Sequence, residues 1–186
     1  MTDPTARDRL VSLLRTLSFE KKRVILASGR ESDFFIDCKQ AELTAEGHAL
    51  LGELMFASLG ELSNVEAVAG VELGGCPLAS AVSLTSFLKG RPIPALYVRK
   101  AQKDHGSKRL IEGDKSMRPG MRIAILEDVV TTGGSTLRCV ATLREAGLVV
   151  AGVIAIVDRL EGGREAIEQA GLKLVSLCTR RDFIPD

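Results

Sequence analysis

Two adjacent carboxylates, Glu127 and Asp128, are followed by a segment rich in hydroxyl groups and glycine, residues 131–136. Neighbouring carboxylates repel each other and lose solvation if they stay empty, but they can accept hydrogen bonds from sugar hydroxyls. The segment after them offers hydroxyls, backbone N–H groups and glycines that let a ligand approach the backbone. At the start of a helix, such groups favour a phosphate dianion. These residue types predict a site for a phosphorylated sugar.

The elements around this segment can be predicted from the pattern of apolar residues. The run 123–126 is typical of a parallel strand covered on both faces, and we expect it to end at Glu127, at the edge of the sheet. A helix should follow and end at Gly147. The alternative is an ordinary strand–turn–helix unit with solvated polar groups. A Walker A loop is excluded, because no Gly-Lys-Ser/Thr sequence follows.

A basic segment, residues 99–109, follows a strand expected at 94–98 and has neither helical nor strand periodicity. A charge run is usually a solvated loop, but a long loop inside a compact domain is often a lid or a binding loop. Cations beside a phosphate site would suit a pyrophosphate leaving group. The side chains that could serve this purpose are Arg99, Lys100, Lys103 and His105.

Two further places carry candidate ligand residues. Residues 24–37 have the pattern of a hairpin, whose Phe34 and Phe35 either fill the core or pack against a planar base. Arg159 follows an apolar run, 149–157, and either pairs with Glu161 at the surface or holds a ligand carboxylate.

Composition limits the classes of function. The 186 residues favour one domain, 1–186, and the net charge of +1 argues against bulk binding to nucleic acid or to a membrane. No apolar run could span a bilayer, and no signal-like core follows the N-terminus. The two histidines and the four widely spaced cysteines give no zinc pattern, and the cysteines indicate reduced thiols of a cytoplasmic protein.

Strands alternate with helices along the chain, so we expect an α/β fold with a mostly parallel twisted sheet flanked by helices. Helices are expected at 7–17, 44–59 and 78–88, and the glycine turn 73–75 before the last of these could contact an anion.

The string Glu-Asp-Val-Val-Thr-Thr-Gly-Gly-Ser at 127–135 resembles the phosphoribosyl-pyrophosphate (PRPP) signature of the type I phosphoribosyltransferases, in the form typical of orotate phosphoribosyltransferases. Arg-Lys-x-x-Lys-Asp-His-Gly at 99–106 is similar to their mobile catalytic loop, and Ser-Gly-Arg-x-Ser at 28–32 to their N-terminal hood. The resemblance implies a type I fold with a hood of about residues 1–40. It also implies a homodimer in which the loop reaches across the interface.

The same resemblance implies an activity: the 5-phosphoribosyl group of PRPP passes to orotate, giving orotidine 5′-phosphate and pyrophosphate in pyrimidine biosynthesis. Mg²⁺ would be held mainly by substrate oxygens. Catalytic roles fall to Lys103, Glu127 and Asp128, and orotate contacts to Phe34, Phe35, Thr131 and Arg159. The implied PRPP ligands are Arg99, Lys100, Lys103, His105, Glu127, Asp128, Val129, Val130, Thr131, Thr132, Gly133, Gly134 and Ser135.

The chain departs from this family at two positions. Ala27 and Gly74 stand where well-studied members carry lysine. Two alternatives stay open: a phosphoribosyltransferase for another base, and a regulator of the same fold that senses PRPP and binds RNA.

Overall fold

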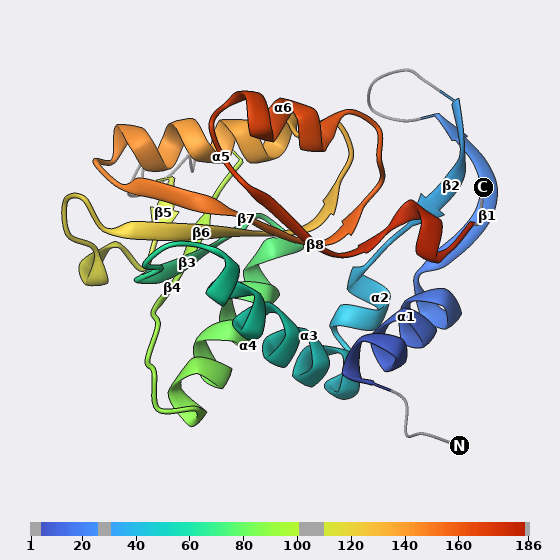
Figure 1. The fold of residues 1–186 in the computed structure, drawn as a ribbon, viewed down its shortest axis with the longest axis horizontal. Helices are drawn as coiled ribbons and strands as arrows, with labels where there is room; N and C mark the ends of the chain where they lie inside the picture. The colour runs from blue at the N-terminus through green and yellow to red at the C-terminus, as the bar shows by residue number, and fades with distance from the viewer. Residues whose placement is uncertain (1–4, 26–30, 101–109, 185–186) are drawn as a thin grey trace, which may run out of the picture.

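The computed structural model describes residues 5–25, 31–100 and 110–184, and Figure 1 shows its central sheet with helices on both faces. The strand order is β5-β4-β3-β6-β7-β8, and every neighbouring pair is parallel except β4 and β5. The mostly parallel α/β architecture predicted from the sequence is therefore confirmed. The strands are β3 (Ala67–Val71), β4 (Ala95–Val98), β5 (Ile111–Glu112), β6 (Arg122–Val130), β7 (Val149–Asp158) and β8 (Leu174–Thr179).

Strand β6 lies at the centre of the sheet, and its first half is the apolar run that predicted it. The strand does not end at Glu127, however, because β7 continues beside it and pairs with Val129 and Val130. The predicted end was therefore wrong, and Glu127 lies inside the sheet rather than at its edge. Residues 128–130 extend β6 as far as the turn that begins at Thr131.

Helices cover the two faces of the sheet in separate groups (Figure 1). Those on one face pack on a core that contains Leu51, Leu78 and Leu126, and those on the other on a core that contains Ile125 and Leu143. The first group is α1 (Ala6–Leu17), α2 (Lys39–Glu42), α3 (Ala45–Ser58) and α4 (Gly75–Leu88); the second is α5 (Gly134–Glu145) and α6 (Gly163–Gln169). No helix in the described part has both the length and the apolarity that a membrane crossing needs.

Helix ends follow the predicted signals. The Thr44 side chain caps α3 by accepting the Gly47 N–H at 3.0 Å. Gly147 follows α5 with a φ of 78° and donates its N–H to the Arg144 carbonyl. Sequence alone was sufficient here because a cap depends on a few neighbouring residues.

The predicted hairpin is also present, as the antiparallel pair β1 (Phe19–Ile25) and β2 (Glu31–Ile36). The Phe34 ring has no exposed surface and packs against Phe19 and Phe183, with ring centroids 5.3 and 5.7 Å away. The hood is thus joined to the body of the protein by an aromatic cluster.

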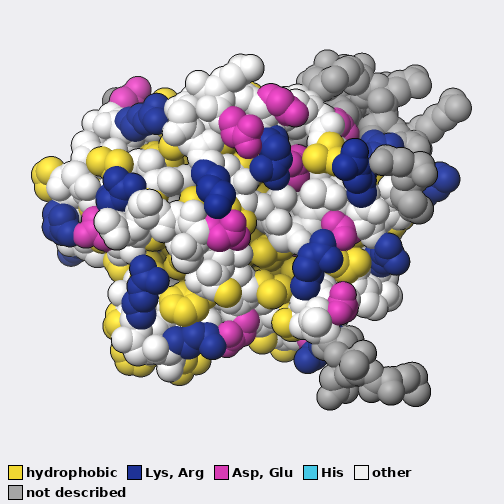
Figure 2. Space-filling view, in the orientation of Figure 1, with side chains coloured by type: hydrophobic (Ala, Val, Ile, Leu, Met, Phe, Trp, Pro, Cys, Tyr) yellow, Lys and Arg dark blue, Asp and Glu magenta, His cyan; other side chains and the backbone are white. Residues whose placement is uncertain are grey.

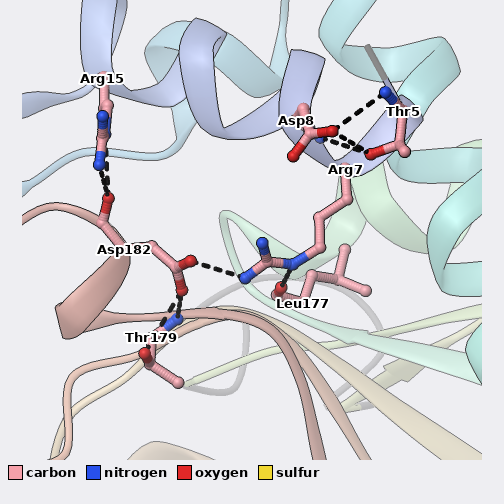
Figure 3. A network of polar contacts seen from close by, with 7 residues as sticks. All are labelled: Thr5, Arg7, Asp8, Arg15, Leu177, Thr179 and Asp182. Atoms are coloured by element: carbon pink, nitrogen blue, oxygen red, sulfur yellow. Dashed lines mark hydrogen bonds and ion pairs between the residues drawn. The ribbon is translucent and has the colours of Figure 1, made fainter. Parts of the chain in front are cut away.

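The C-terminal segment, which gave no sequence signal, ties α1 to the end of β8 (Figure 3). The Asp182 carboxylate accepts the Thr179 N–H at 2.7 Å and an Arg7 N–H at 2.7 Å. Arg7 also donates to the Leu177 carbonyl, and Arg15 donates to the Asp182 carbonyl. Burial opposes ionisation of Asp182, but the bonds from Thr179 and Arg7 outweigh it and lower the pKa.

Substituting Asp182→Ala should lower the free energy of unfolding by about 1–3 kcal/mol, because the Thr179 N–H and the Arg7 guanidinium lose their acceptor. Since Arg7 is half exposed, most of the cost should come from the Thr179 end rather than from the ion pair. The lowered pKa means that this contribution exists above pH 3.8 and shrinks as the pH falls further. Urea unfolding at two pH values measures it. Glu46→Ala, which breaks only an exposed pair with Arg9, is the matched control and should cost less than about 1 kcal/mol.

Candidate active site

The two carboxylates point into different surroundings. Glu127 is 4% exposed, and its Oε1 accepts the hydroxyls of Thr136 at 2.8 Å and Ser135 at 3.3 Å. Burial raises its pKa to about 7, against the lowering effect of the Thr136 bond and with a further rise from Asp128. Asp128 is only partly buried, and its Oδ1 accepts the Val129 N–H at 2.8 Å. Asp128 is therefore the more accessible acceptor for a sugar hydroxyl.

Gly74 is packed against Asp128. A β-carbon at Gly74 would lie 2.1 Å from Asp128 Oδ2 and 2.4 Å from its Cγ, far inside van der Waals contact. The next residue, Gly75, begins α4 and is packed in the same way against the Leu126 carbonyl, 2.4 Å from an added β-carbon. A side chain at Gly74 would therefore require the Asp128 carboxylate to move.

The turn after β6 forms a pocket of about 350 Å³, lined by residues 129–136 and Arg138. Gly133 has a φ of 78°, which glycine adopts without strain, and α5 begins directly after it at Gly134. The first N–H groups of a helix have no partner within the helix, so they favour an anion in such a pocket. Gly163 of α6 supports the turn from behind, because an added β-carbon there would lie 2.7 Å from the Thr131 carbonyl.

The start of the basic segment lies next to this pocket. Arg99 donates to the Glu112 carboxylate at 2.9 Å, and the Lys100 N–H donates to Glu72 at 3.3 Å. Both residues line a second pocket of about 260 Å³, and Ser135 and Arg138 line it as well as the first. The structure therefore brings Arg99 and Lys100 close to the turn at residues 131–136. Lys103 and His105 lie outside the described residues, as does Ala27.

Arg159 follows β7 and is 6% exposed, so the alternative of a surface arginine is wrong, although the expected pair with Glu161 is present at 3.0 Å. Its guanidinium also donates to the Phe34 carbonyl at 2.8 Å and lies 5.1 Å from the centre of the Phe34 ring. Because that ring is fully buried, a base cannot pack against it in this arrangement, and the contact predicted for the Phe34 ring needs correction. Phe35 is half-buried, with the Lys22 ammonium over its ring at 4.0 Å.

Three residues near the site were missed or left without a role by the sequence analysis. Thr136 holds Glu127, Arg138 lines both pockets, and Gly163 supports the turn. Thr136 and Arg138 lie on the first turns of α5, so their position relative to a predicted helix start was the available signal. Gly163 had none, since its contact depends on tertiary packing.

Replacing Thr136 with valine removes a hydroxyl that stabilises the charged form of Glu127, so the pKa of Glu127 should rise above its value of about 7. We expect the acidic limb of the pH profile of kcat/KM to move up by about 0.5–1 pH unit, because an ionised Glu127 is the better acceptor. Thr142→Val on the same helix, whose hydroxyl bonds only the Arg138 carbonyl, is the control and should leave the limb in place. An unmoved limb in Thr136→Val would show that Glu127 does not set it.

Acidic and basic side chains are interleaved over the molecular face seen in Figure 2. The near balance of 25 Lys and Arg against 24 Asp and Glu agrees with that view. In the part of the chain that the structure describes, no group of three or more His, Cys, Asp and Glu side chains is placed to hold a metal ion.

Comparison with known proteins gives consistent results. The phosphoribosyl transferase domain family matches residues 40–171. An orotate phosphoribosyltransferase of Sorangium cellulosum (strain So ce56) is 75% identical over 180 residues, which cover 97% of this chain and 94% of the relative.

Two solved structures of the orotate phosphoribosyltransferase of Mycobacterium tuberculosis H37Rv are similar as well. The complex with Fe(III) dicitrate is 40% identical, covers 97% of this chain and 99% of that chain, and has a TM-score of 0.82. The complex with 5-phospho-alpha-D-ribosyl 1-diphosphate (PRPP) is 35% identical, covers 98% and 93%, and has a TM-score of 0.77. Each of these three matches extends over almost the whole chain.

Proposed function

This chain belongs to the orotate phosphoribosyltransferases, and on that premise we propose how its residues transfer the 5-phosphoribosyl group from PRPP to orotate. The products are orotidine 5′-phosphate, a pyrimidine nucleotide, and pyrophosphate. One observation carries the proposal: Asp128, near the end of β6, and the pocket lined by residues 129–136 both lie at the carboxyl end of β6, whose two neighbouring strands are parallel to it.

PRPP would bind with its 5′-phosphate in the turn and its ribose hydroxyls on the carboxylates. Residues Thr131 to Ser135 supply hydroxyls and the free N–H groups of α5. Asp128 would accept from the ribose directly, while Glu127 is held in place by Thr136. Fixing the ribose in this way brings C1 into a defined position before the bond to pyrophosphate breaks.

The leaving pyrophosphate carries growing negative charge, which fixed cations can stabilise. Arg99 and Lys100 lie beside the phosphate turn, and we assign the same task to Lys103 and His105 on the resemblance of the basic segment. A segment that covers the site would also exclude water, which otherwise could hydrolyse PRPP.

We propose Mg²⁺ as the metal, bound mainly through the pyrophosphate and ribose oxygens of PRPP. Mg²⁺ usually keeps few protein ligands at phosphate sites and binds largely through the substrate phosphates. When bound, the ion neutralises charge as the C1–O bond breaks.

Orotate would be recognised through its carboxylate and its planar ring. Arg159 is already oriented by Glu161 and the Phe34 carbonyl, and a guanidinium fork matches a carboxylate. Thr131 and Phe35 are the remaining candidates for contact with the base. The Phe34 ring is buried in the hydrophobic core.

The assembly and location that we propose also follow the family resemblance. A homodimer would let the basic segment of one subunit serve the site of the other, and Leu84, Phe87 and Leu88 of α4 leave apolar surface that a second subunit could cover. All four cysteines are free thiols, which suits the reducing cytoplasm.

A competition assay tests the choice of base. Uracil, adenine, guanine and xanthine at about a hundredfold excess should leave orotate conversion within about twofold of the uninhibited rate. A competitor that is itself converted faster than orotate would favour the alternative of a phosphoribosyltransferase for another base.

A further inference from the structure

Glu42 ends helix α2 and has no exposed surface. Neither of its carboxyl oxygens has a hydrogen-bond partner among the residues that the structure describes. A buried carboxylate without donors or a cation is costly, and a protein normally avoids it by pairing the group or by keeping it neutral. The proposed reaction gives this residue no task, so its burial without a partner needs an explanation.

Three charged groups act on the pKa of Glu42. Asp128 of β6 has the largest effect, followed by Lys39 of α2 and then by Asp37, which precedes α2. Glu42 in turn raises the pKa of the Cys76 thiol of α4. The Lys39 ammonium is paired with Asp37 at 2.5 Å and makes no hydrogen bond to Glu42. Glu42 is thus within electrostatic range of a second carboxylate and has no ion pair among the described residues.

Cys38, one turn before Glu42, is also fully buried, and among charged groups Asp128 acts on it most strongly. Cys38 and Glu42 therefore both lie within electrostatic range of Asp128, whose carboxylate packs against Gly74. Glu42 is thus a buried carboxyl group near the proposed ribose ligand.

We propose that Glu42 is a positioning residue that carries a proton near the ribose site, so that Asp128 keeps the negative charge with which it binds the sugar. Two neighbouring carboxyl groups in a poorly solvated site do not both ionise. Asp128 is partly exposed and accepts the Val129 N–H, whereas Glu42 has no exposed surface and no donor among the residues that the structure describes. The proton therefore belongs on Glu42. In agreement, burial first and Asp128 second raise the pKa of Glu42 to about 8.

This inference rests on the proposed function, because it takes Asp128 as the ribose ligand, and it has a consequence for substrate binding. When Glu42 ionises at alkaline pH, a second negative charge appears behind a site that binds the polyanion PRPP. The KM for PRPP should then rise. At pH 7, kcat should depend little on Glu42. The thermal stability should also fall as the pH rises from 4.5 to about 8 and then level off, because over this range the unfolded chain has released a proton that the folded chain keeps.

The test compares wild type with Glu42→Gln, which has nearly the same shape but cannot ionise. Glu46→Gln on α3, an exposed glutamate paired with Arg9, is the matched control. At pH 7 the infrared spectrum of wild type minus Glu42→Gln should contain the carbonyl band of a protonated carboxyl group. From pH 7 to pH 9 the KM for PRPP of wild type should rise about three- to tenfold more than that of Glu42→Gln, with kcat at pH 7 within about threefold.

Two results would overturn the proposal. The first is a difference spectrum without the band, which would mean that Glu42 is ionised. The second is a Glu42→Gln variant whose KM for PRPP either follows the wild-type pH profile or is raised at every pH. Glu42→Met keeps the test possible if glutamine does not fold: it should retain PRPP affinity if a neutral group is required and lose it if a charge is required. The infrared result does not depend on turnover, so a failure of the proposed reaction can be told apart from a failure of this inference.

Discussion

Lys103→Ala should lower turnover by about two orders of magnitude or more and leave the fold intact. The leaving pyrophosphate needs cations, and Lys103 belongs to the string that most resembles the catalytic loop of this family. Arg99 and Lys100, which start that string, lie at the pocket beside the phosphate turn, so the segment begins in the right place. Steady-state kinetics with saturating orotate and PRPP measure the loss, and circular dichroism checks the fold.

Lys115→Ala is the matched control for this prediction. Lys115 is exposed in the short helical turn Asp114–Ser116, beyond the basic segment. Its removal should change turnover by less than about twofold, because it lines neither pocket near the site. Near-normal turnover in Lys103→Ala would remove the basic segment from the mechanism.

Gly74→Ala should lower kcat/KM for PRPP by about 10- to 100-fold with little change in stability. The new β-carbon would lie 2.1 Å from Asp128 Oδ2, so the carboxylate must rotate away from the position in which it meets the ribose. Because the clash involves a partly exposed side chain rather than backbone, the fold can accommodate it.

Two other glycines provide the comparison. Gly60→Ala meets no atom within 4 Å and should leave both activity and stability near the wild-type values. Gly75→Ala meets the backbone carbonyl of Leu126 at 2.4 Å and should lower stability instead. Urea unfolding and PRPP kinetics on the three variants separate the effects, and a Gly74→Ala enzyme with normal kcat/KM would show that the position of Asp128 is not critical.

Most of the fold could be predicted because its signals are local. Apolar runs specified the buried strands, and Thr44 and Gly147 marked helix ends where they occur. The end of β6 was misplaced because a polar residue was taken as a strand end, whereas the long partner β7 extends the ladder past Glu127. Pairing between strands far apart in sequence decides such ends.

The sequence predicted which types of residue form the site better than it predicted which residues contact one another. The turn, Asp128, Arg99 and Lys100 come together as expected, since one strand end and its neighbour supply them. The Phe34 ring was assigned to the base although it packs with Phe183, a partner from the C-terminal segment that has no periodicity. Glu42 could not be recognised either, because its burial and its closeness to Asp128 arise only from tertiary packing.

The measurement that tests the central claim most directly uses the purified chain with orotate, PRPP and Mg²⁺. The absorbance of orotate should fall only when PRPP and Mg²⁺ are both present, and mass spectrometry should identify orotidine 5′-phosphate as the product. A preparation that is folded and binds PRPP but leaves orotate unchanged would contradict the proposed transfer.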